Sequence, residues 1–207
     1  THVVAHSEGT VIAFLAMLQA LSAMEMQDPD GKRGIQHGGW IRHVKGFMTI
    51  GSPIDKHLAL WPNLWRDFRF TTEVLPRSGA VVVQSTRNGA HLVCLAEKIK
   101  WRNYFDYGDP VGFRLDEACR SLTEDMCCDA FEFDTARHDH GFSRYPLPGK
   151  AHVDYWNDGE LFGHFIDTVV SRPKEPATRP PANRKLYHHF AKCFPYLLGY
   201  GLHFVAL

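Results

Sequence analysis

Apolar residues occur along this chain in blocks whose lengths alternate between those of strands and those of helices. A short apolar run at residues 2–6 precedes residues 10–26, which are rich in Ala, Leu and Met and too long for a strand. We therefore expect a strand followed by a mostly buried helix. Residues 43–55 predict a second strand that runs into a loop, because the Ser52-Pro53 pair interrupts regular structure.

The second half of the chain continues the alternation. Residues 98–112 predict a strand and a loop, residues 116–128 a short helix, and residues 136–158 a loop dense in His, Gly and Pro. The apolar positions of residues 159–170 have helical spacing. This order is typical of an α/β fold with a mostly parallel sheet flanked by helices, in which functional groups gather at the carboxyl ends of the strands.

Three segments depart from this pattern. Residues 57–98 carry aromatic residues without a clear period, and we expect either a packed surface subdomain or a lid or insertion over a pocket, with the aromatic residues of 61–70 as candidate pocket lining. Residues 171–185 predict a polar, proline-rich linker. Residues 186–207 form an apolar tail whose last 14 residues fall short of the roughly 20 needed to span a bilayer, so the tail is either the start of a membrane segment or a helix that docks on the domain.

Length and composition fit a globular protein of one domain with 207 residues. Lys plus Arg number 23 and Asp plus Glu number 23, so the charge balance gives no indication of a nucleic-acid partner. The five cysteines are odd in number and include no C-x-x-C, which favours reduced thiols, as in a cytoplasmic protein, over a disulfide scaffold or zinc ribbon. Both ends of the sequence fall inside apolar runs, so we expect a fragment of a longer protein.

The most specific candidate for chemistry is Ser7. It lies in Ala5-His6-Ser7-Glu8-Gly9, between the first predicted strand and the first predicted helix. A serine nucleophile needs a base for its proton and N–H donors for the oxyanion, and a sharp strand-to-helix turn with small flanking residues supplies the exposed position. The alternative is an ordinary serine that caps the helix.

This stretch resembles the nucleophile turn of the α/β-hydrolase family, in particular its lipase-like and esterase-like members. The resemblance covers roughly residues 1–170 as the C-terminal part of that fold, with the N-terminal strands missing, and it extends to the TIGSP run at residues 49–53. In this family the catalytic triad follows the chain order Ser, then Asp or Glu, then His.

The resemblance implies an acid and a base in the second half of the chain. Asp109, in the D-P-V run 109–111, resembles the family's acid, and Asp106 is its competitor. His152, in the H-x-x-Y-W run before the last predicted helix, resembles the base. For the competing histidines His138 and His140, we favour a solvent-exposed polar loop, because no companion residues with credible spacing suggest a metal site.

The implied function is hydrolysis of a carboxylic ester, from a lipid or a small molecule, through an acyl-enzyme and without a metal or organic cofactor. Ser7 would be the nucleophile, His152 the base and acid, Asp109 the orienting carboxylate, and the backbone N–H of Glu8 one oxyanion donor. The second donor is expected from a loop outside this sequence. Three alternatives stay open: a non-catalytic binding or scaffold domain of the same fold, an acyltransferase, and a peptidase. The location is predicted to be cytoplasmic or membrane-associated.

Overall fold

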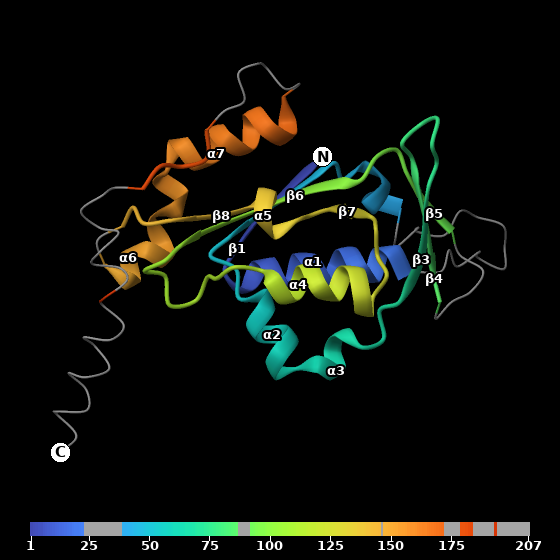
Figure 1. Ribbon diagram of the computed structural model, residues 1–207, viewed down its shortest axis with the longest axis horizontal. Coiled ribbons are helices and arrows are strands. Elements are labelled where there is room, and N and C mark those ends of the chain that lie inside the picture. The colour runs from blue at the N-terminus through green and yellow to red at the C-terminus, as the bar shows by residue number, and fades with distance from the viewer. Residues whose placement is uncertain (23–38, 87–91, 146, 172–178, 184–192, 194–207) are drawn as a thin grey trace, which may run out of the picture.

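The computed structural model describes residues 1–22, 39–86, 92–145, 147–171, 179–183 and 193 (Figure 1). The end of the first predicted helix, at residues 23–26, lies outside these residues. So do most of the predicted linker and, apart from Cys193, the predicted apolar tail. In the short described part of the linker, the side-chain oxygen of Asn183 accepts a hydrogen bond from the backbone N–H of Ser143 at 2.8 Å.

A parallel sheet forms the centre of the fold, as the alternation of strands and helices predicted. Its strands are β1 (His2–His6), β2 (Gly46–Ile50), β6 (Ile99–Asp106), β7 (Phe131–Glu132) and β8 (Asp139–Phe142). The spatial order is β1-β2-β6, and β7 and β8 both pair with β6 on its remaining side. Because all of these strands are parallel, the loops that follow β1, β2 and β6 meet at one edge of the sheet.

The prediction of a loop at residues 136–158 is wrong over much of that range. Its first part contains α5 (Thr135–His138) and β8, and its last part contains α6 (Pro148–Val153) and the 3₁₀ turn η3 (Asp154–Asn157). β8 pairs in parallel with the second half of β6, from Asn103 opposite Asp139 to Asp106 opposite Phe142. This strand is too short and polar to show a strand periodicity in the sequence. It forms because pairing with β6 supplies its backbone hydrogen bonds.

Helices cover both faces of the sheet (Figure 1). One face carries α1 (Glu8–Ser22), α2 (Ile54–Leu60) and α4 (Asp116–Arg120), which continues into the helical turn η2 (Ser121–Asp125). The other face carries α7 (Gly159–Phe165) and its continuation η4 (Ile166–Val170), which together confirm the helix predicted at residues 159–170. α1 begins at Glu8, two residues earlier than predicted, so Ser7 leads directly from β1 into the helix.

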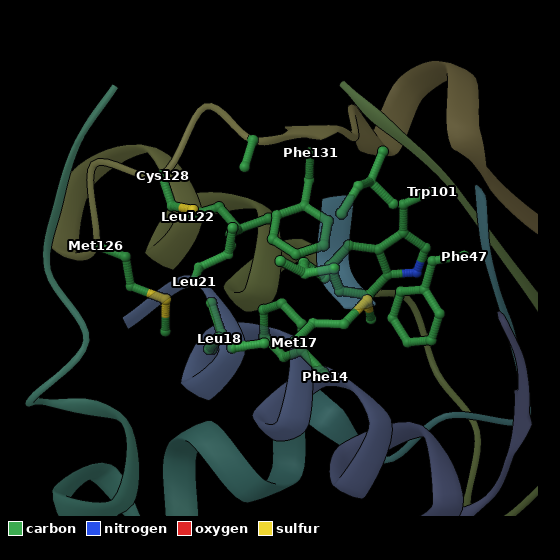
Figure 2. Close-up of a cluster of buried hydrophobic side chains, with 14 of the residues drawn as sticks. Phe14, Met17, Leu18, Leu21, Phe47, Trp101, Leu122, Met126, Cys128 and Phe131 are labelled. Carbon is green, nitrogen blue, oxygen red and sulfur yellow. The ribbon is translucent and has the colours of Figure 1, made fainter. Parts of the chain in front are cut away.

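Alternating side chains of the strands build one core on each face of the sheet. Phe47 and Trp101 point toward α1 and pack with Phe14 and Phe131, as Figure 2 shows. The opposite core contains these residues: Met48, Ile50, Tyr104, Phe142, Tyr155, Leu161, Phe165 and Val169. The period of two along a strand explains why neighbouring residues such as Phe47 and Met48 belong to different cores. This double burial fixes the sheet and the loops at its carboxyl edge.

Residues 57–98 form the end of α2, helix α3 (Pro62–Trp65) and a second, antiparallel sheet. This sheet has the order β3 (Phe70–Val74), β4 (Val81–Ser85) and β5 (Leu92–Leu95). It packs near the C-terminal end of α1, at the opposite end of the molecule from α6 (Figure 1). Its buried side chains join the core that packs against α1; they are Phe70, Val81, Val83, Val93 and Leu95. The described strands of this sheet therefore lie at the opposite end of α1 from Ser7.

Candidate active site

Ser7 occupies the turn between β1 and α1 in a backbone conformation that L-amino acids rarely adopt. Its φ angle is +54°, in the left-handed region. For a residue with a β-carbon this conformation costs on the order of 1–2 kcal/mol. A serine that caps a helix usually has an extended backbone instead. The geometry at Ser7 is that of a strained strand-to-helix turn that presents its hydroxyl beyond the sheet edge.

Four hydrogen bonds hold this turn. The backbone N–H of Ser7 donates to the carbonyl of Ile50 at 3.0 Å, which extends the pairing of β1 with β2 by one residue. Thr10, one turn into α1, donates to the carbonyl of Ser7 through its backbone N–H at 2.9 Å and its hydroxyl at 2.7 Å. The Thr10 hydroxyl also lies 2.7 Å from the hydroxyl of Ser52, in the loop after β2. The neighbouring strand and its loop thus stabilise the strained residue.

The side chains of Ser7, His152 and Asp109 lie in a line of hydrogen bonds. Oγ of Ser7 is 2.9 Å from Nε2 of His152, and Nδ1 of the same ring is 3.0 Å from both carboxylate oxygens of Asp109. An ionised carboxylate only accepts hydrogen bonds, so Nδ1 carries the ring proton and Nε2 is free to accept the serine proton. The structure therefore brings together the three residues that the sequence singled out.

Asp109 is 3% exposed and lies in the loop after β6. Its carboxylate also accepts the backbone N–H of Val111 at 2.8 Å and the hydroxyl of Tyr155 at 2.8 Å. Asp106, the competing acid, points elsewhere: its carboxylate accepts the backbone N–H groups of Gly108 at 2.7 Å, Arg144 at 2.7 Å and Tyr145 at 3.3 Å. Burial raises the pKa of Asp106 above its ordinary value, although these hydrogen bonds oppose the rise. Asp106 thus anchors the loop after β8 and makes no contact with His152 in this network.

His152 lies in α6, after β8, and its backbone is tied to the nucleophile turn. Nε2 of His6 donates to the carbonyl of His152 at 2.7 Å, and the two rings lie against one another with centroids 4.7 Å apart. Burial lowers the pKa of His6, although its hydrogen bond to the His152 carbonyl opposes this shift, so the net effect favours the neutral ring. The residue before the nucleophile therefore positions the segment that carries the base.

The competing histidines do not form a solvent-exposed polar loop, and that prediction is wrong. His138 ends α5 and His140 lies within β8; both side chains are partly buried. The His140 ring packs against the rings of Tyr104 and His164, at centroid distances of 5.2 and 4.6 Å. Burial, and then the charge of His164, lower the pKa of His140 to about 3. Pairing of β8 with β6 is what directs this histidine into the fold.

The backbone N–H of Glu8 begins α1 and so has no acceptor within its own helix. Its position beside Ser7, at the positive end of the helix dipole, suits an oxyanion donor. The Glu8 side chain turns outward and pairs with Nε2 of His57 at 2.9 Å. The Trp61 ring lies over the His57 ring at a centroid distance of 4.6 Å. Residues of α2, together with Trp61 at its end, therefore flank the nucleophile turn.

The aromatic residues of 61–70 do not, as a group, surround Ser7. Trp65 and Phe68 line a cleft of about 530 Å³ between α2–α3 and α4. A second cleft, of about 690 Å³, has a charged lining that includes Arg144, Asp158 and Glu160. Neither Ser7 nor His152 lines either cleft. Of these aromatic residues, Trp61 lies near the nucleophile turn through its contact with His57, and the lining of an acyl pocket by this run stays a prediction.

Two residues of the site had no role assigned from the sequence. Gly51 follows β2 with a φ angle of +55°, and a β-carbon there would lie 2.8 Å from Oδ2 of Asp109. Tyr155, three residues after His152, donates to the same oxygen. Both belong to short runs that carried the family resemblance, so the available signal was their presence in those runs. By contrast, a β-carbon on Gly9 would meet no atom within 4 Å, so the described surroundings do not require glycine there.

The described residues contain no group of three or more His, Cys, Asp or Glu side chains arranged to hold a metal ion. In the same parts of the chain, no helix combines the length and apolar character needed to cross a membrane. A scan against protein-family models found no match, and searches of curated proteins and of solved structures found none either.

Proposed function

We propose that this protein is a serine hydrolase of the α/β-hydrolase type, which cleaves carboxylic esters through an acyl-enzyme. One observation carries the proposal: the continuous hydrogen-bonded line from Oγ of Ser7 through the imidazole of His152 to the carboxylate of Asp109. The chain order Ser, Asp, His supports the same assignment, as does the placement of Ser7 after β1 and of Asp109 after β6, the two parallel strands on either side of β2.

In the first half of the proposed reaction, Oγ of Ser7 attacks the ester carbonyl carbon while Nε2 of His152 takes the hydroxyl proton. The carbonyl π electrons move to oxygen, and the resulting oxyanion lies near the backbone N–H of Glu8 at the start of α1. The ester C–O bond then breaks, and the leaving alcohol takes the proton from Nε2. The product is an ester of Ser7 with the acyl group.

In the second half, water replaces the alcohol. His152 removes a proton from water as the oxygen attacks the acyl carbon, and the same proton returns to Oγ of Ser7 when the acyl-enzyme bond breaks. Asp109 remains ionised throughout, accepts the Nδ1–H of His152 and stabilises the imidazolium in both halves. Its burial at 3% exposure strengthens this interaction relative to water.

The strain at Ser7 favours a catalytic role over a purely structural one. A left-handed serine costs free energy, and the hydroxyl that this conformation presents bonds the His152 ring. A scaffold domain would have no need for that arrangement. Strained backbone of this kind persists where the surrounding structure enforces it, as Thr10 and Ile50 do here.

Apolar side chains near the turn support an apolar acyl group in the substrate. Trp61 is 52% exposed and packs on His57, which pairs with Glu8. Trp156 is 51% exposed and packs against His6 at a centroid distance of 5.8 Å. Two exposed indoles thus flank the nucleophile turn and suit the chain of a lipid or other apolar ester.

The direct test is covalent labelling with a fluorophosphonate, which reacts with activated serine hydroxyls. We expect the probe mass on the peptide that contains Ser7, and its loss in Ser7→Ala, with ester turnover reduced on the order of 10⁴-fold or more. His140→Gln is the matched control, because that histidine is partly buried and packs against Tyr104 and His164 rather than against Ser7. Labelling that persists in Ser7→Ala, or no labelling of a folded wild-type protein, would refute the proposal.

Release of free acid from p-nitrophenyl esters in water then separates hydrolysis from acyl transfer. If the apolar surroundings of Ser7 select the acyl group, longer acyl chains should give a higher kcat/KM than acetate. Trp156→Ala should reduce that preference without abolishing labelling of Ser7.

A further inference from the structure

Tyr155 makes two hydrogen bonds that connect the acid of the site to the end of strand β6. The residue lies in η3 and is fully buried. Its hydroxyl donates to Oδ2 of Asp109 at 2.8 Å and accepts the backbone N–H of Asp106 at 2.8 Å. The direction of each bond is fixed, because a backbone N–H only donates and the phenol has a single proton.

The Asp109 carboxylate depends on Tyr155 for one of its two oxygens. Oδ1 accepts the backbone N–H of Val111, whereas Oδ2 accepts the Tyr155 hydroxyl; the His152 ring lies 3.0 Å from both oxygens. Without the phenol, Oδ2 would keep only the shared imidazole. Because Asp109 is 3% exposed, bulk water is not at hand to replace the lost donor.

The segment that supplies this phenol also supplies the base. His152 and Tyr155 are three residues apart, at the junction of α6 and η3. The ring of Tyr155 packs within the core that covers the α7 face of the sheet. Burial, and then the charge of Asp109, raise the pKa of Tyr155 well above its ordinary value, so the phenol is protonated at neutral pH.

We propose that Tyr155 is a positioning residue, whose hydroxyl fixes the carboxylate of Asp109 so that the His152 imidazole is aimed at Ser7. This inference rests on the proposed function and adds a fourth side chain to its machinery. Tyr155 touches neither the substrate nor the reacting atoms, and acts only through Asp109.

The test is a double-mutant cycle on the rate of fluorophosphonate labelling of Ser7. Tyr155→Phe removes the hydroxyl and keeps the ring. In the wild-type background we expect a fall in the labelling rate of about 10- to 100-fold, the range for losing a hydrogen bond to a charged group. In an Asp109→Asn background the same change should cost less than about two-fold, because its target carboxylate is already gone. An equal loss in both backgrounds, or no loss in the first, overturns the proposal.

Tyr104→Phe is the matched control. Tyr104 is also fully buried, and its hydroxyl bonds Nδ1 of His164 at 2.7 Å, away from Asp109. We expect it to lower the melting temperature without changing the labelling rate. A fall in labelling equal to that of Tyr155→Phe would assign the effect to general loosening of the core and overturn the proposal.

A second measurement does not depend on reactivity. The proton on Nδ1 of His152 should give a downfield NMR resonance while the Asp109 carboxylate is held against it, and Tyr155→Phe should shift or broaden this resonance while Tyr104→Phe leaves it unchanged. An unchanged resonance in Tyr155→Phe overturns the inference. The two proposals fail separately: no labelling of the wild-type protein refutes the hydrolase, whereas normal labelling of Tyr155→Phe refutes only the role of Tyr155.

Discussion

Gly51 and Asp109 approach so closely that a β-carbon on Gly51 would lie 2.8 Å from Oδ2 of the aspartate. The same β-carbon would lie 3.3 Å from Nδ1 of His152 and 3.0 Å from the ring of Tyr155. The φ angle of Gly51 is +55°, which independently favours glycine. The turn after β2 thus packs directly against Asp109 and His152.

Gly51→Ala should therefore reduce both stability and reactivity. The left-handed backbone alone costs a residue with a β-carbon about 1–2 kcal/mol, and relief of the contact displaces the carboxylate. We expect Ser7 labelling to slow at least about 10-fold, because a small misplacement of catalytic groups has a large effect on rate. Gly9→Ala is the control: its β-carbon meets no atom within 4 Å, so labelling should change little. A larger loss in Gly9→Ala than in Gly51→Ala would contradict this account.

The choice of base is tested by exchanging single histidines. His152→Gln should lower the rate of Ser7 labelling on the order of 10³-fold or more, since among the described residues no other side chain is hydrogen-bonded to the Ser7 hydroxyl. His140→Gln should leave the rate within a factor of a few, because its ring packs against Tyr104 and His164 instead. Time courses of labelling followed by intact mass spectrometry measure both. The assignment of the base fails if the two variants exchange these outcomes.

The aspartate that ends β6, Asp106, and the one in the loop after it, Asp109, should separate stability from reactivity. Asp109→Asn keeps the shape of the side chain but removes the charge that holds the His152 proton on Nδ1, so labelling should fall on the order of 10⁴-fold. In Asp106→Asn, the side-chain amide cannot accept all of the backbone N–H groups that donate to the carboxylate. We therefore expect a lower melting temperature and a much smaller effect on the rate of Ser7 labelling. Thermal denaturation and labelling rates, measured on both variants, decide the matter. A larger fall in the labelling rate in Asp106→Asn than in Asp109→Asn would assign the role of the acid to Asp106.

His140 should make the protein less stable in mild acid. Its pKa is about 3 in the folded protein and near 6.5 when unfolded, so between these pH values the unfolded chain binds the additional proton. Stability from this group is therefore present above pH 6.5 and falls as the pH drops toward 3, by at most about 1.4 kcal/mol per pH unit. The charges nearest to the ring, on His164, Arg102 and His138, act in the same direction.

Asp55 and Asp139 oppose this trend. Burial raises the pKa of each to about 6, so the folded state binds their protons first and gains relative stability as the pH falls toward 3.8. A comparison of wild type with His140→Gln by urea unfolding at pH 7.5 and pH 4.5 isolates the histidine. We compare the free energy of unfolding of the variant with that of wild type at each pH. This difference should favour the variant by more than about 1 kcal/mol more at pH 4.5 than at pH 7.5. An equal difference at both pH values would show that His140 is protonated alike in both states.

The sequence alone determined the features that depend on neighbouring residues. The strand-to-helix turn at Ser7 was predicted because small residues flank the serine between an apolar run and a helix-forming run. The helix at residues 159–170 was predicted because its apolar positions repeat with helical spacing. The alternation of strands and helices indicated a parallel sheet, whose loops meet at one edge.

Only the tertiary structure decided which of several equivalent residues meet. The sequence offered Asp106 and Asp109, three residues apart, as candidate acids. The choice depends on the backbone N–H groups of Arg144 and Tyr145, almost 40 residues later in the sequence, which donate to Asp106. The sequence placed His140 in an exposed loop, whereas pairing with β6 buries the ring. The short runs that contain Gly51 and Tyr155 do not indicate their contact with Asp109, because that residue is 58 and 46 residues away along the chain. Periodicity and turn chemistry act over a few residues, whereas contacts across the sheet edge depend on strand order and register, which are set by packing of the whole core.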